Sequence, residues 1–156
     1  MNITCFAIGK TKEPEYIQFI EAYTQKVKHY NNFDFIELPG VKNANKMDVF
    51  KLKEEEGKYI LGKITPQTFL ILLDEKGKEF SSTEFSQFIN KKLLSGSKEI
   101  VFLIGGAFGF SDEIYQRAND KIALSKMTFT HQMVRVVFTE QIYRAFSILK
   151  GEKYHH

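Results

Sequence analysis

The chain has 156 residues, of which 43% are hydrophobic, 26% charged and 14% aromatic. This composition is typical of one globular domain spanning residues 1–156, and it excludes collagen-like, mucin-like and intrinsically disordered chains. The net charge of +3, from 22 basic and 19 acidic residues, indicates no particular partner by itself. We expect no membrane segment, because the longest apolar runs are far shorter than the roughly 20 residues that cross a bilayer.

The N-terminal residues Met1–Lys10 lack the basic start and small-residue cleavage site of a secretory signal, which favours a cytoplasmic protein. Cys5 is the single cysteine and lies in an apolar run, so we expect a small buried core residue. One cysteine forms neither a disulfide nor a cysteine zinc site within a chain. The pair His155-His156 could bind a metal, but adjacent terminal histidines are more often tail residues, and we expect no metal site.

The first half of the chain predicts two strands and two helices. Asn2–Gly9 is rich in β-branched and apolar residues, which is typical of a strand. A helix should begin near Pro14, because apolar side chains then recur at spacings of three and four residues. Phe33–Leu38 predicts a second strand, and Met47–Ile64 an exposed amphipathic helix. The expected apolar anchors of that helix are Met47, Phe50, Tyr59 and Ile60.

Two unbroken apolar runs, Phe69–Leu73 and Ile100–Ile104, are typical of strands covered on both faces in a parallel sheet. We expect the first of these strands to end at Asp74. Between them, Ser81 is followed three residues later by Glu84, a capping box that predicts the start of a helix.

The C-terminal third predicts a short helix from Ser111 to about Ala118, a short strand at Ile122–Leu124 and a long helix over His131–Leu149. Strands therefore alternate with helices along the whole chain. This order predicts an α/β fold with a mostly parallel sheet flanked by helices.

Ligands of open α/β sheets bind beyond the carboxyl ends of strands, here Leu73-Asp74, Ile104-Gly105 and Leu124-Ser125. Glycines at Gly105–Gly109 would let the backbone approach a ligand closely, although a plain structural turn is equally open. Their spacing is not that of a dinucleotide-binding loop, which disfavours a nucleotide-dependent oxidoreductase. The chain has no Gly-x-Ser-x-Gly elbow, which disfavours a hydrolase.

The excess positive charge lies in the C-terminal fifth of the chain. Residues 126–156 contain five basic and two acidic residues, so this segment carries +3 and the remainder none. A solvated helix face or a polyanionic partner would each account for this distribution.

Long motifs in the second half of the chain resemble the ribosomal large-subunit pseudouridine N3-methyltransferase family of the SPOUT superfamily. The motifs are Ile104–Gly109 (IGGAFG), Leu124–Val137 (LSKMTFTHQMVRVV), Glu140–Ala145 (EQIYRA) and the ending Tyr154–His156. The resemblance covers essentially the whole chain. It implies a homodimer with a C-terminal trefoil knot that binds S-adenosylmethionine. It also implies methylation of N3 of a pseudouridine in the 23S rRNA of the assembled ribosome.

The same resemblance implies which residues act. The donor pocket would be formed by Leu73, Gly105, Leu124, Ser125, Lys126, Met127, Thr128 and Phe129. Because the attacking ring nitrogen must lose its proton, a base or an anion-stabilising cation is required. We expect Arg135 and His155 to bind substrate or stabilise its anion, and His131 or Tyr154 to lie nearest the proton. Alternatively, His131 simply opens the last helix and Arg135 pairs with an acid across the dimer.

Two other functions stay open. A SPOUT methyltransferase acting on tRNA would share the donor pocket, while the Tyr154-His155 ending favours the ribosomal substrate. A non-catalytic RNA-binding protein would use the basic tail and retain only a vestigial pocket, and binding of S-adenosylmethionine would argue against it.

Overall fold

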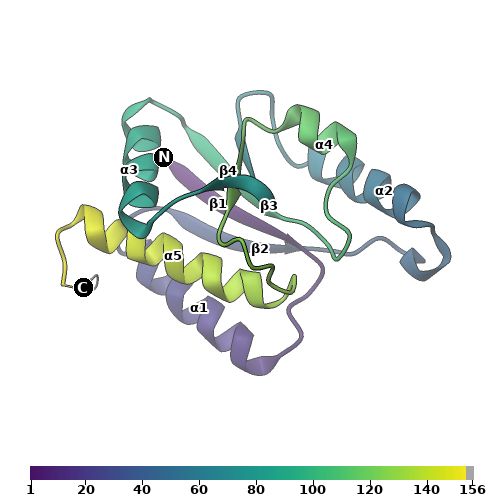
Figure 1. The fold of residues 1–156 in the computed structure, drawn as a ribbon, viewed down its shortest axis with the longest axis horizontal. Coiled ribbons are helices and arrows are strands. Elements are labelled where there is room, and N and C mark those ends of the chain that lie inside the picture. Colours follow the sequence, from purple (N-terminus) through teal and green to yellow (C-terminus); the bar gives the residue numbers. More distant parts are fainter. Residues whose placement is uncertain (154–156) are drawn as a thin grey trace.

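A five-stranded sheet forms the centre of the computed structural model, which describes residues 1–153 (Figure 1). The strands are β1 (Asn2–Ile8), β2 (Phe33–Leu38), β3 (Phe69–Glu79), β4 (Glu99–Ile104) and β5 (Asp120–Ala123), arranged β2-β1-β4-β3-β5. All four pairs of neighbouring strands are parallel, which confirms the expected α/β class. The trefoil knot implied by the resemblance stays a prediction.

Helices cover both faces of this sheet (Figure 1). They are α1 (Pro14–Lys28), α2 (Val49–Leu61), α3 (Ser82–Leu94), α4 (Asp112–Arg117) and α5 (Met133–Leu149), with a 3₁₀ turn at Ala44–Lys46. One layer contains α1, α3 and α5, and the other contains α2 and α4. Helix α3 begins with the predicted capping box: Ser81 Oγ accepts from the amide of Glu84, whose carboxylate accepts from the amide of Ser81. No helix within residues 1–153 is long and apolar enough to cross a membrane.

Alternate residues of the central strands belong to two separate hydrophobic cores. Along β4, Phe102 packs toward α3 and α5, whereas Val101 and Leu103 pack toward α2 and α4. Both faces are thus buried, which is the reason for the unbroken apolar runs. Cys5 is fully buried in the first core, as expected, and burial raises the pKa of its thiol.

Strand β3 does not end at Asp74 but continues to Glu79. Its pairing with β5 slips at this point, so that Leu73 and Lys78 both lie opposite Ile122. The polar residues that suggested an end to the strand occupy this bulge. Gly77 makes the close approach possible, since a Cβ atom there would lie 2.5 Å from the backbone nitrogen of Ile122. Only the tertiary pairing with β5 reveals the continuation.

Helix α2 packs less of its predicted apolar face than expected. Ile60 is buried, but Phe50 is 68% exposed and Tyr59 is also exposed. Within residues 1–153, the other helix of this layer is the six-residue α4, and Phe50 in the N-terminal turn of α2 stays exposed.

Candidate functional site

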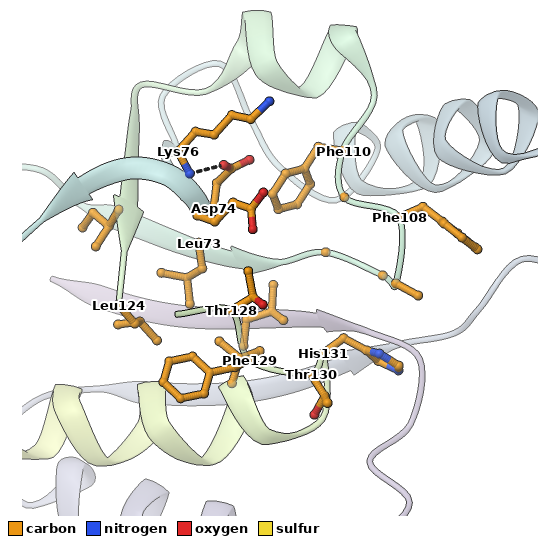
Figure 2. Close-up of a pocket in the computed structure, with 18 of the residues that line it drawn as sticks. Leu73, Asp74, Lys76, Phe108, Phe110, Leu124, Thr128, Phe129, Thr130 and His131 are labelled. Carbon is orange, nitrogen blue, oxygen red and sulfur yellow. Dashed lines mark hydrogen bonds between the residues drawn. The ribbon is translucent and has the colours of Figure 1, made fainter. Parts of the chain in front are cut away.

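The bulge of β3 and the carboxyl ends of β4 and β5 open onto one cavity of about 720 Å³ (Figure 2). Parallel strands end at a common edge, which is why three segments distant in sequence meet here. Ligand pockets generally measure roughly 300–1,000 Å³, so the cavity is large enough for a nucleoside-sized ligand.

Seven of the eight residues expected in the donor pocket line this cavity: Leu73, Gly105, Leu124, Ser125, Met127, Thr128 and Phe129. The eighth, Lys126, is exposed in the same loop and does not line the cavity. Leu73 lies at the bulge of β3, Gly105 directly follows β4, and the others follow β5. Seven residues that were expected to form one pocket therefore lie together in space, although they come from three separate segments.

Side-chain hydroxyls fix the loop that follows β5. Ser125 Oγ accepts from the amide of Met127 at 3.0 Å, and Thr130 Oγ1 accepts from the amide of Met133 at 3.1 Å. Such local bonds favour a turn over a helix or strand. The second bond lies at the start of α5, so it also sets how the loop enters that helix.

Two cavity-lining residues, Asp74 and Tyr115, were absent from the expected site. The Asp74 carboxylate accepts from the amide of Lys76 at 2.8 Å and from the Tyr115 hydroxyl. Burial and this bond raise the pKa of Tyr115, so its phenol stays protonated. The position of Asp74 directly after an apolar run is the sequence pattern that indicates a place in the site. No pattern in the sequence indicates that Tyr115 on α4 belongs there.

His131 lines the cavity and is partly buried just before α5. Burial, and the cationic side chains of Arg135 and Lys12, lower the pKa of its imidazole. The neutral form therefore prevails at neutral pH, and a neutral imidazole can accept a proton. Of the four residues expected to act in catalysis, only His131 is found at the cavity among residues 1–153.

Arg135 is fully buried and does not line the cavity. Its guanidinium donates to the carbonyls of His131 (2.9 Å), Gly9 (2.9 Å) and Ile8 (2.7 Å) and to Thr11 Oγ1 (3.0 Å). A carboxylate oxygen of Glu37 in the same chain lies 3.8 Å away, so the acid it pairs with is not across a dimer. Arg135 thus has a structural role: it joins the start of α5 to the end of β1.

The predicted tail residues Tyr154 and His155 lie outside the described residues. Lys153, the last described residue, follows the end of α5, while the cavity lies at its beginning. The basic C-terminal segment is not one continuous cationic face. Arg135 is internal, and Arg144 is paired with Glu140 at 2.6 Å. Within residues 1–153, no cluster of three or more His, Cys, Asp or Glu side chains could hold a metal ion.

The fold and the cavity define a parallel α/β domain with a candidate ligand site at the edge of its sheet where such domains bind their ligands. Residues 1–155 match the family described as "Predicted SPOUT methyltransferase", and the chain belongs to that family. It is similar over its full length to proteins named "Ribosomal RNA large subunit methyltransferase H". The protein from Cytophaga hutchinsonii is 51% identical, covering 100% of both chains. Those from Flavobacterium psychrophilum and Christiangramia forsetii are 51% and 49% identical, covering 100% of this chain and 99% of theirs.

We expect Arg135→Met to lower the free energy of unfolding by about 3 kcal/mol or more, because it leaves buried carbonyl groups unpaired. Urea denaturation followed by circular dichroism measures this loss. Lys28→Met is the control, since Lys28 forms an exposed ion pair with Asp34 and should leave the midpoint unchanged. Equal stability of the two variants would contradict the structural role of Arg135.

Proposed function

We propose that the protein transfers a methyl group from S-adenosylmethionine to N3 of a pseudouridine in the 23S rRNA of the assembled ribosome. The observation that carries this proposal is the cavity itself, which is lined by the residues of the family motifs. Full-length identity of 49–51% to proteins named as ribosomal RNA large subunit methyltransferases supports RNA as the substrate.

The cavity residues fit the methyl donor. Apolar side chains of Leu73, Leu124 and Phe129 offer surfaces for an adenine ring, and the loop after β5 offers backbone groups for its polar edge. Asp74 supplies a negative charge inside the cavity, which suits a cationic ligand. S-adenosylmethionine, when bound, supplies an electrophilic methyl group on a positively charged sulfur.

His131 is the described residue best suited to take the proton from the substrate nitrogen. Its side chain is on the cavity wall, and its lowered pKa keeps the imidazole neutral at physiological pH. Arg135 acts as a positioning residue, because its guanidinium holds the backbone carbonyl of His131.

A second copy of the chain completes the site in this proposal. Helix α5 has 17 residues and is about 25 Å long, and it separates the cavity from Lys153. Lys153, the last described residue, therefore lies about one helix length from the cavity. In a homodimer, the tail of one subunit can serve the cavity of the other.

RNA would reach the cavity as an unpaired loop. A protein that acts on a base takes it out of its stack, and single-stranded loops are the part of RNA that can be splayed in this way. Lys53 and Lys76, which line the cavity, are the cations available to the RNA backbone there. A ribosomal substrate implies that the protein works in the cytoplasm.

Transfer of a labelled methyl group from S-adenosylmethionine tests the proposed activity directly. We expect label on 23S rRNA in assembled ribosomes that lack the modification, and little on free large subunits or bulk tRNA. Label on tRNA would instead identify a SPOUT methyltransferase that acts on tRNA. An absence of donor binding by calorimetry would leave a non-catalytic RNA-binding protein as the better account.

The pH dependence of kcat/KM tests His131. The imidazole accepts a proton only when neutral, and its pKa is lowered, so activity should fall on acidification below about pH 6.5. We expect His131→Asn to lose about 100-fold in kcat and to lack this acid limb. The exposed His29→Asn is the matched control and should keep the wild-type profile. An acid limb that survives in His131→Asn would assign the base elsewhere.

Mixed dimers test the contribution of the partner's tail. Gly105→Leu should displace the pocket wall, since a Cβ atom there would lie 3.0 Å from the ring of Phe110, which lines the cavity. A second variant lacks residues 154–156. We expect each to be inactive alone and an equal mixture to regain about one quarter of wild-type activity, because half of its dimers then carry one complete site. No recovery after verified subunit exchange would mean that the tail serves its own subunit.

A further inference from the structure

Phe108 lies at the tip of a tight turn on the rim of the cavity. The turn spans Gly106–Gly109, and the amide of Gly109 donates to the carbonyl of Gly106 at 3.3 Å. Phe108 lines the cavity yet is 57% exposed, whereas Phe110, two residues later, is 4% exposed. Figure 2 shows Phe110 turned toward Asp74 and Phe108 pointing away from it. The turn therefore presents one phenyl ring to solvent.

The turn that carries Phe108 packs closely against Glu56 and Phe110. A Cβ atom on Gly106 would lie 3.1 Å from a carboxylate oxygen of Glu56, and one on Gly105 would lie 3.0 Å from the Phe110 ring. Gly109 adopts φ +80°, a backbone conformation that favours glycine. The base of the turn is therefore closely packed, whereas Phe108 at its tip is exposed.

Phe108 has no aromatic partner in the described part of the chain. Leaving a phenyl ring in water forgoes the stabilisation that burial would give it. Lys53 lines the same cavity, and no ion pair within residues 1–153 includes it. An exposed aromatic ring and an unpaired lysine in one cavity are the combination that holds single-stranded nucleic acid, by stacking on a base and attracting the phosphate backbone.

We propose that Phe108 is a stacking platform for an unpaired base of the RNA substrate, with Lys53 attracting the adjoining backbone. This inference rests on the proposed function, because it assumes that an RNA loop enters the cavity. The ring is assigned to RNA and not to the methyl donor on the basis of its position. In Figure 2 it lies at the opposite end of the cavity from Leu124, one of the donor-pocket residues.

Two substitutions at Phe108 separate stacking from simple apolar contact. Phe108→Leu keeps an apolar side chain but removes the flat ring, and we expect kcat/KM for ribosomes to fall between about fivefold and 100-fold. Phe108→Tyr keeps the ring and should stay within about twofold of wild type. Phe19→Leu is the matched control, because Phe19 is 55% exposed on α1 and does not line the cavity.

The affinity for S-adenosylmethionine, measured by calorimetry, should be the same in wild type and Phe108→Leu. The dependence of ribosome binding on salt should also keep its slope in Phe108→Leu, since stacking releases no counterions, whereas Lys53→Gln should lower it. Weaker donor binding in Phe108→Leu, or an unchanged kcat/KM for ribosomes, would overturn the proposal. Failure of the proposed function is a different result, in which the wild-type protein itself transfers no label to ribosomes.

Discussion

Four hydrogen bonds from the buried guanidinium of Arg135 hold the start of α5 against the end of β1. A charge in this position is tolerable only because backbone carbonyls and a hydroxyl surround it. The bond to the His131 carbonyl fixes the last turn of chain before the helix, where the cavity loop ends. The wall of the cavity that contains His131 therefore depends on a residue that never reaches the cavity itself.

The other wall depends on tight backbone packing. β3 bulges around β5 at Gly77, and the turn after β4 lies against Glu56 and the Phe110 ring. At Gly77 the backbone of β5 leaves no space for a Cβ atom, and at Gly105 and Gly106 a Cβ atom would force the Phe110 ring or the Glu56 carboxylate to shift. These two places bring Asp74 and Phe108 to the cavity, where one supplies a negative charge and the other an aromatic surface.

The number of basic residues in a segment does not show where their charges lie in the folded chain. The excess of basic residues in segment 126–156 suggested a cationic surface for a polyanion. In the folded chain Arg135 is internal and Arg144 is paired with Glu140. The lysines at the cavity come instead from α2 and β3, whose own segments show no excess of positive charge. Folding thus brings cationic side chains to the cavity from segments that carry no net positive charge.

The sequence by itself determined the α/β class and the positions of most elements, and seven of the eight residues that the resemblance assigns to a donor pocket line the cavity. Periodicity, capping and long motifs are local properties, so they can be read without coordinates. Only the tertiary structure decided that β3 continues past Asp74, that Arg135 is structural, and that Tyr115 lines the cavity. Each of these facts depends on contacts between segments far apart in the chain, and local sequence patterns carry no information about such contacts.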